Sequence, residues 1–476
     1  MIKMTQNSLN TVLQLILITT VCCNLIMTPA SASDLKQATL SLQSFIRQAT
    51  AKDLAFESIL LEQLPLQYRR DILLPASDVI MDVKYQHNFY LQQDTDNPEA
   101  SISLSKLFPY NGTELSLSYG KNSSALSGTD ESSLELLISQ PIAKNAFGKS
   151  TKLHEKIIGI ENSISRYQIV EAYEDYLASL TAAYYNWYSA YENLRVSQSS
   201  YQSSKVLMEN ILDRQRQKIA LPIDVNKMKL LLIGKKENII IQEEVYKTYA
   251  NLIYKAINQP DNAAYIPLKP KPATTKIAFE KDYDIFITNS RTYMILNMLA
   301  QQSNLQVDQT SDELMPSTNL LLGYQINGLD WGLTDQNDNL FAGISVRWPF
   351  GQTANKAKKQ LAAIDHKRTL LSNTNKNQQL NITLRNLYLQ IQREQQLIAV
   401  SDQKIRLATD ILKDEAENYS YGKVSLNDYI SAVNSVDENR FRHTDHTVKL
   451  NKLLIEWLRL TDQLVSEDIL SRSKTK

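Results

Sequence analysis

The sequence predicts an α+β chain that is mostly α, built as a tandem repeat of two long α-helical hairpins with a few β-strands. Two segments of about 70 residues contain almost no helix breakers, whereas an ordinary globular helix has about 11–12 residues. Short runs of alternating apolar and polar residues come before each segment, and the order of elements is the same in both halves. The elements follow in chain order.

The first segment, 1–32, is typical of a secretory signal peptide. Lys3 supplies a weak positive charge, and the stretch 12–27 is mostly apolar. Ala30-Ser31-Ala32 then provides the small-x-small pattern after which a signal peptidase cuts. A core helix of a globular protein is disfavoured by this position and pattern. We therefore expect an exported chain whose mature form begins near Ser33.

Cysteine use and composition exclude several classes of site. Cys22 and Cys23 both lie in the signal segment, so the mature chain would contain neither disulfides nor thiolate metal sites. Lys+Arg and Asp+Glu balance at 51 each, which gives no electrostatic case for a nucleic-acid partner. Beyond the signal segment, no apolar run reaches the roughly 18 residues of a membrane helix. Membrane contact would therefore require strands or a surface.

The first long helix is expected between Pro141 and Pro222, a stretch without proline. Apolar residues recur there at steps of four and three, with one three-residue stammer. They are Leu153, Ile157, Ile160, Ile164, Tyr167, Val170, Tyr173, Leu177, Leu180, Tyr184, Trp187, Tyr191 and Leu194. This heptad seam predicts a coiled coil. A helix of such length would span about 100 Å and must pack lengthwise on other helices.

The second long helix is expected after Gly351, because the only later glycine is Gly422. Its seam is weaker: Leu384, Tyr388, Ile391, Ile398, Ile405 and Leu412, with Gln395 and Asp402 at seam positions. Amphipathic, proline-free segments follow both long helices, at 224–257 and 426–465. The connections, 218–223 and 421–425, are short enough to require an antiparallel return, so each pair is predicted to form a hairpin.

Strands are expected before each long helix. In the first half, alternating residues run from Val79 to Leu91, and shorter runs occupy 115–119 and 134–138. The second half has such runs at 318–326 and 341–348. The stretch 102–107 either adds a strand or forms a loop.

These elements divide the chain into two repeats. The first covers 33–257, with an initial helix, strands at about 78–141 and a hairpin tip at about 218–223. A proline-rich connector, 258–278, leads to the second repeat at 279–465, with a helix, strands at about 318–348 and a tip at about 421–425. A polar tail, 466–476, follows. Leu74-Pro75-Ala76-Ser77 and Met315-Pro316-Ser317-Thr318 open the strands alike. The alternative is two unrelated coiled-coil stretches.

With these motifs, the chain resembles the TolC-type outer-membrane efflux family (outer membrane factors) over nearly its whole mature length. The strands end in Pro141…Phe147-Gly148 and Pro349-Phe350-Gly351. The second tip, from Tyr421 to Ala432, matches the family pattern of glycine, serine or threonine, aspartate and alanine. The resemblance implies a homotrimer in which each subunit adds four strands to one outer-membrane β-barrel. It also implies that the helices form a periplasmic tunnel.

The resemblance also implies functional residues at the tips. A tunnel gate would contain Asp428 and Asp224. Residues that dock a periplasmic adaptor (membrane fusion) protein would be Lys218, Leu221, Pro222, Gly422, Lys423 and Ser425. Further partners would be an inner-membrane transporter and outer-membrane lipid.

Three positions depart from the family pattern. Lys218 stands where the first tip usually has glycine. Val424 replaces a tip arginine that pairs with a carboxylate matching Asp224, and Ser431 replaces a second acid. We therefore expect a weakly latched entrance.

Catalytic and cofactor motifs are absent from the sequence, which indicates neither an enzyme nor a cofactor. His443 and His446 share a helix face, where they could bind a metal or simply be solvated. Asp428 is open to two interpretations. Threefold symmetry would make it a ring of carboxylates that favours cations; alternatively, it is an ordinary first-turn acid that the helix dipole stabilises.

The function that these features predict is passive conduction. The chain would be the outer-membrane channel-tunnel of a tripartite efflux or type I secretion system. The alternative is an exported structural or adhesive coiled-coil protein, which would not explain the strands that precede each hairpin.

Overall fold

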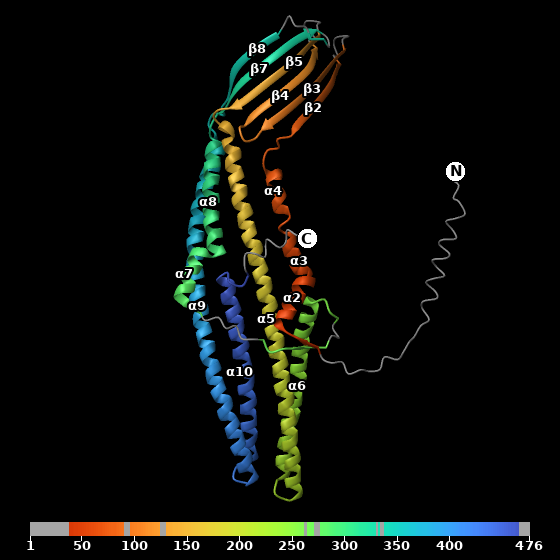
Figure 1. Cartoon of the computed structure of the whole chain (residues 1–476), viewed down its shortest axis with the longest axis vertical. Coiled ribbons are helices and arrows are strands. Elements are labelled where there is room, and N and C mark those ends of the chain that lie inside the picture. Colours follow the sequence, from red (N-terminus) through yellow and green to blue (C-terminus); the bar gives the residue numbers. More distant parts are fainter. Residues whose placement is uncertain are drawn as a thin grey trace, which may run out of the picture.

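The computed structural model describes residues 38–89, 96–123, 130–260, 264–270, 277–329, 332–333 and 338–465. The expected signal peptide at 1–32, the cleavage site before Ser33 and the tail at 466–476 lie outside these residues. The molecule is elongated, with a β-sheet at one end and, at the other, the two turns that each connect a very long helix to the helix that follows it (Figure 1). The expected mostly helical α+β chain is confirmed.

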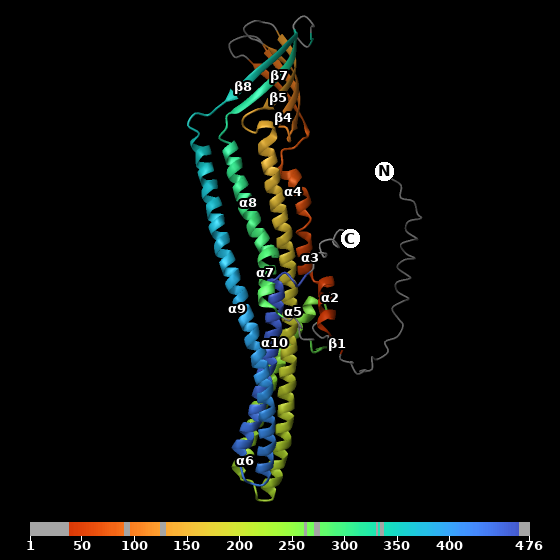
Figure 2. The same cartoon turned by 60° about the vertical axis from the view of Figure 1, so that its left-hand side comes forward.

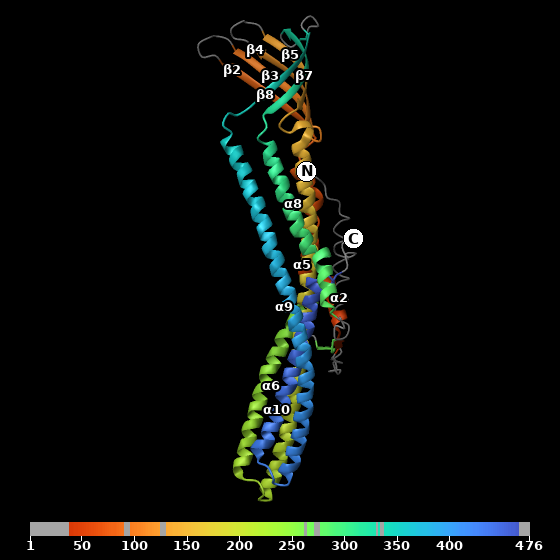
Figure 3. The same ribbon diagram turned by 90° about the vertical axis from the view of Figure 1, so that its left-hand side faces the viewer.

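Two very long helices run along the molecule. Helices α5 (Lys149–Arg216) and α9 (Thr353–Ser420) have 68 residues each, and each corresponds to about 100 Å. Helices α6 (Pro222–Ala256) and α10 (Leu426–Leu460) follow them with 35 residues each. Helix α5 packs on α6, α9 packs on α10, and α10 also packs on α5. The four helices thus lie side by side in the half of the molecule away from the sheet (Figure 3).

Short helices extend each half toward the sheet. In the described part of the first half these are α2 (Leu42–Lys52), α3 (Leu54–Leu61) and α4 (Pro65–Leu73). Asp53 ends α2 and caps α3, because its carboxylate accepts a 3.0 Å hydrogen bond from the Ala55 amide. The second half has α7 (Phe279–Asn289) and α8 (Arg291–Asp312), and α8 runs between α5 and α9 (Figure 2).

The sheet end is a single antiparallel sheet of six strands in the described part of the chain, in the order β2-β3-β4-β5-β7-β8. The first half provides β2 (Val79–Phe89), β3 (Asp96–Phe108), β4 (Thr113–Ser123) and β5 (Asp130–Pro141). The second provides β7 (Ser317–Leu329) and β8 (Asp338–Arg347). The stretch 102–107, left open between strand and loop, belongs to β3. Six strands differ from the four per subunit that the family resemblance implied.

The two faces of this sheet differ in polarity along its whole width. One row across the strands is apolar: Met81, Leu104, Leu117, Leu136, Tyr324 and Leu340. The adjacent row, on the opposite face, is polar: Asp82, Ser103, Ser118, Glu135, Gln325 and Asn339. Successive residues of a strand point to opposite faces, so the alternation seen in the sequence yields one apolar and one polar surface.

An aromatic core lies at the middle of each half. In the first, Phe45 of α2 packs with Tyr184 and Trp187 of α5. The short strands β1 (Ala38–Leu40) and β6 (Tyr265–Pro267) pair in parallel over it, and the Tyr184 hydroxyl lies 2.7 Å from the Leu40 carbonyl oxygen. In the second half, Phe286 of α7 packs with Trp457 of α10. Helix α2 therefore packs against the α5–α6 pair, and helix α7 packs against the α9–α10 pair.

The heptad seam is found in α5 but is shifted in α9. In α5, Ile157, Ile164, Val170, Leu180, Tyr184, Trp187 and Leu194 are buried. In α9, Gln395 and Asp402, expected at seam positions, are exposed, and Glu394 and Ser401 are buried instead. The expectation for these two positions was wrong, because Glu394 is held by ion pairs with Arg393 and Lys449 and by His446 at 2.8 Å. A polar residue can occupy a coiled-coil seam when it is paired in this way.

Candidate functional site at the hairpin tips

The first tip joins α5 to α6 by a tight turn. Lys218 follows the end of α5 with a positive φ of 62°, and the Ile219 amide donates a 2.8 Å hydrogen bond to the Arg214 carbonyl oxygen. Pro222 opens α6, where its fixed φ suits a first helical residue. The Asp224 carboxylate accepts a 3.1 Å bond from the Leu221 amide, so this acid caps the helix.

The second tip joins α9 to α10 by the same kind of turn. Gly422 has a φ of 71°, and the Lys423 amide donates a 3.0 Å bond to the Asn418 carbonyl oxygen. Ser425 caps α10, and its amide and hydroxyl donate to the Asp428 carboxylate at 3.1 and 2.7 Å. Lys218 and Gly422 thus occupy equivalent positions, and only glycine adopts that backbone conformation without strain.

Asp428 is an exposed anion at the molecule's sheet-distal end. Its pKa lies below the ordinary value, first because the Ser425 hydroxyl donates to the carboxylate and second because the Ser425 amide does. Both bonds stabilise the charged form. The structure therefore gives Asp428 the helix-start role, and its charge also remains available to an approaching cation.

Arg214 makes a contact between the hairpins that the sequence analysis did not identify. Its guanidinium Nη1 donates a 3.1 Å bond to the carbonyl oxygen of Ser420, and it lies 4.9 Å from the ring centroid of Tyr419. The arginine belongs to α5, whereas both partners belong to the end of α9. A basic residue in the last turn is common in helices, so the sequence offered no signal that set Arg214 apart.

Apolar packing and an ion pair reinforce this contact. Leu207 and Ile211 of α5 and Val225 and Met228 of α6 form one cluster with Leu426 of α10. Further from the tips, Lys235 of α6 binds Asp437 of α10 at 2.7 Å, and both side chains are largely buried. The two tips are thus held against each other.

The outer rim of the tips exposes large apolar side chains beside lysines. Ile219, Leu221 and Ile223 are 54–63% exposed on the first tip, and Tyr421 is 67% exposed on the second. Lys423 lies 5.3 Å from the Tyr421 ring centroid. Exposed apolar residues in contiguous groups are typical of interaction surfaces.

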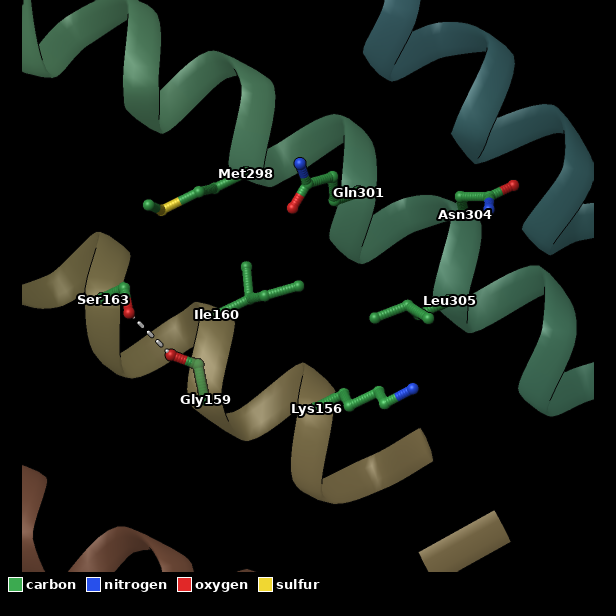
Figure 4. A pocket seen from close by; sticks show the side chains of 8 residues that line it. All are labelled: Lys156, Gly159, Ile160, Ser163, Met298, Gln301, Asn304 and Leu305. Atoms are coloured by element: carbon green, nitrogen blue, oxygen red, sulfur yellow. Dashed lines mark hydrogen bonds between the residues drawn. The ribbon is translucent and has the colours of Figure 1, made fainter. Parts of the chain in front are cut away.

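A hollow of about 490 Å³ lies between α5 and α8, far from the tips (Figure 4). Met298 and Gln301 of α8 face Ile160 of α5 across it, and Lys156 is its one charged lining residue. The Ser163 hydroxyl donates to the Gly159 carbonyl oxygen at 2.9 Å. The lining contains no carboxylate or histidine, and the Ser163 hydroxyl is used within its own helix.

The histidine pair on α10 contacts α9. His446 Nδ1 lies 2.8 Å from Glu394 Oε2, and His443 Nδ1 lies 3.0 Å from the Ser401 hydroxyl. Within the ranges that the structure describes, His, Cys, Asp and Glu residues form no group of three able to hold a metal ion. Nor does any helix in those ranges combine the length and apolarity needed to cross a membrane.

Solved structures share this fold. No protein-family model and no curated protein matches the chain. The outer-membrane protein VceC of Vibrio cholerae has 13% identity and a TM-score of 0.68, over 88% of this chain and 95% of that one. The CmeC outer-membrane channel of Campylobacter jejuni also has 13% identity, with a TM-score of 0.67 over 91% and 89%. The open state of the MtrE outer-membrane channel of Neisseria gonorrhoeae matches with 13% identity and a TM-score of 0.67, over 90% and 93%. The chain therefore has the fold of these channels.

Proposed function

We propose that this chain is the outer-membrane channel of a tripartite efflux or type I secretion system and works as a homotrimer. The observation that carries the proposal is the apolar row that crosses all six strands of the sheet from Met81 to Leu340, placed at the end of two helices about 100 Å long. Lipid would contact the apolar face, and the helices would extend into the periplasm. The fold shared with VceC, CmeC and MtrE supports this orientation.

Closure of the sheet requires more than one chain. In the described part of the chain, β2 and β8 pair on one side only. An open strand edge in hydrocarbon leaves backbone groups without hydrogen bonds, each at a cost of several kcal/mol. Three copies joined edge to edge would remove every open edge.

The tips would form the inner end of the conduit. Leu221, Pro222 and Lys218 on the first tip, with Gly422, Lys423 and Ser425 on the second, would dock the hairpins of a periplasmic adaptor protein. An inner-membrane transporter would supply the energy, and the chain would conduct substrate passively. The exposed apolar side chains on the rim of the tips support docking, because their burial against a partner is energetically favourable.

Fractionation separates this proposal from an exported structural or adhesive coiled-coil protein. We expect heat-modifiable trimers in the outer-membrane fraction that require detergent for extraction and conduct ions in planar bilayers. A soluble periplasmic species would support the alternative. Purification of the native complex would then identify the adaptor and the inner-membrane transporter.

Asp428→Asn is expected to reduce cation preference and block by multivalent cations in planar bilayers. Three Asp428 carboxylates around a narrow entrance would attract cations, and asparagine removes the charge while it retains an oxygen acceptor for the Ser425 amide. Asp410→Asn, an exposed acid on α9, is the control. Unchanged selectivity in Asp428→Asn would leave this residue with its capping role alone.

Arg214→Ala is expected to increase the single-channel conductance of the trimer or the fraction of time it is open. The substitution removes the bond to the Ser420 carbonyl oxygen and the contact with Tyr419, which tie the two tips together. Arg216→Ala provides a matched control, because Arg216 is exposed and, among the described residues, forms its ion pair within its own helix, with Asp213. Equal conductance in both variants would contradict a latch at Arg214.

A further inference from the structure

We propose that all six strands of each chain enter the barrel wall, so that the trimer closes an eighteen-stranded barrel through a β8–β2 seam between neighbouring subunits. This inference rests on the proposed trimeric channel and departs from the four strands per subunit that the family resemblance implies. The competing arrangement uses β4, β5, β7 and β8 alone, with the β2–β3 hairpin outside the wall.

Strands β2 and β3 carry the same two faces as the other strands. Met81 of β2 and Leu104 of β3 continue the apolar row of Leu117 and Leu136. One residue further, Asp82 and Ser103 continue the polar row. A hairpin outside the wall would have no reason to match both surfaces in register.

Exposure supports the same conclusion. Val79, Met81, Val83 and Tyr85 of β2 are 58–68% exposed, and Leu340, Ile344 and Val346 of β8 are 61–72% exposed. Their exposure exceeds that of Leu117 or Leu136 in the middle of the sheet, at 39% and 41%. The two edge strands thus carry apolar side chains on this face, as the central strands do. These side chains are more exposed because β2 and β8 lack a neighbouring strand on one side in the described part of the chain.

Strand directions allow the seam. The strands are antiparallel at every step from β2 to β8, and a six-stranded series of this kind has first and last strands in opposite directions. The β8 strand of one subunit and the β2 strand of the next would consequently pair antiparallel. The edge of β4 that a four-stranded unit would present is already paired with β3 from Ala100 to Phe108.

Strand lengths fix the register of the seam. The row that begins at Val79 ends at Ala342 of β8. Full pairing of β8, Asp338–Arg347, with β2 would set Ala342 opposite Tyr85, six residues beyond Val79. An even shift keeps apolar side chains on one face. The same shift of six residues would occur at each of the three seams of the trimer, so the shear number of the barrel would equal its number of strands. A barrel whose shear number equals its strand number has strands tilted by about 36°, within the usual range.

Paired cysteines test this seam. The expected mature chain contains no cysteine, because Cys22 and Cys23 lie in the signal segment. In the proposed register, Ile344 faces Val83 on the apolar side, and Gly343 faces Lys84 on the polar side. Both double-cysteine variants are needed, because pairs on the two faces of an antiparallel ladder differ in spacing. A Cβ at Gly343 would meet no heavy atom within 4 Å.

The matched comparison places cysteines at the competing seam. Full pairing of β8 with β4 of a neighbour would set Ile344 opposite Leu117 and Gly343 opposite Ser118. The parent single-cysteine variants report whether each substitution permits trimers. After oxidation in the outer membrane, we expect covalent dimers and trimers from the β2 pairs and none from the β4 pairs.

Each other outcome is decisive. Covalent trimers from the β4 pairs, or trimers that neither set links, would overturn the six-stranded wall and leave the trimeric channel intact. A wild-type chain that forms no outer-membrane trimers would instead refute the proposed function. As a measurement independent of any substitution, electron cryomicroscopy of the wild-type trimer should show eighteen strands in cross-section, and twelve would overturn the inference.

Discussion

Leu117→Arg is expected to abolish the outer-membrane trimer. Leu117 lies in the middle of the apolar row, between Leu104 and Leu136. In the proposed orientation its side chain faces lipid, where arginine near the bilayer midplane costs about 2–4 kcal/mol per copy. A trimer would contain three copies. The measurement is the amount of heat-modifiable trimer in the outer-membrane fraction, together with soluble or degraded chain.

Ser118→Arg is the matched control for this prediction. Ser118 is the next residue of β4, and its side chain lies on the polar face opposite Ser103 and Glu135. We expect normal amounts of trimer, because a charge facing a water-filled lumen remains solvated. Equal loss of trimer in both variants would mean that β4 does not have one lipid face and one aqueous face.

Arg291→Met is expected to lower the free energy of unfolding by about 3–5 kcal/mol, the usual cost of removing one member of a buried ion group. The Arg291 guanidinium forms ion pairs with Glu174 of α5 and, at 2.9 Å, with Asp462 after α10. The Arg291 and Glu174 side chains are only 4% and 2% exposed. Burial raises the pKa of Glu174 while Arg291 opposes that rise, so the variant would leave a buried acid without its cation.

Thermal and urea unfolding, followed by circular dichroism, measures this effect. Arg368→Met is the control, because Arg368 pairs with Asp365 on an exposed face of α9 and such pairs contribute about 0–1 kcal/mol. The combined variant Arg291→Met, Glu174→Gln, Asp462→Asn should recover much of the loss, since it also removes the charges of the two acids that pair with Arg291. Similar unfolding of Arg291→Met and Arg368→Met would contradict a structural role for this ion group.

The sequence predicted the helices and most strands because both obey local rules. Long stretches without proline and with few glycines mark α5 and α9, so their C-terminal ends could be located from Pro222 and Gly422. Alternation identified β2, β4, β5, β7 and β8. The 102–107 stretch remained open because Lys106 occupies an apolar position of its short alternation, and only pairing with β2 and β4 shows that it is a strand.

Tertiary contacts explain what the sequence did not reveal. Glu394 is buried in α9 because residues 52 and 55 positions later, His446 and Lys449, bind it, and no periodicity indicates such partners. Arg214 reaches Ser420 across 206 positions. Lys218 was correctly placed at the glycine position of the first tip, whereas the gate and docking roles of the tip residues remain predictions.

The pairing of β5 with β7 has a consequence for the order in which the chain folds. Glu131 pairs with Leu329 and Pro141 with Asn319, so this ladder joins segments separated by all of α5 and α6. Strands β2 to β5 can form a meander from near neighbours, whereas β5 must wait until β7 has been synthesised. Long-range pairing is slow because the loop must close first. During that interval an apolar strand edge is exposed to water, which makes β5 a segment at risk of aggregation until β7 pairs with it.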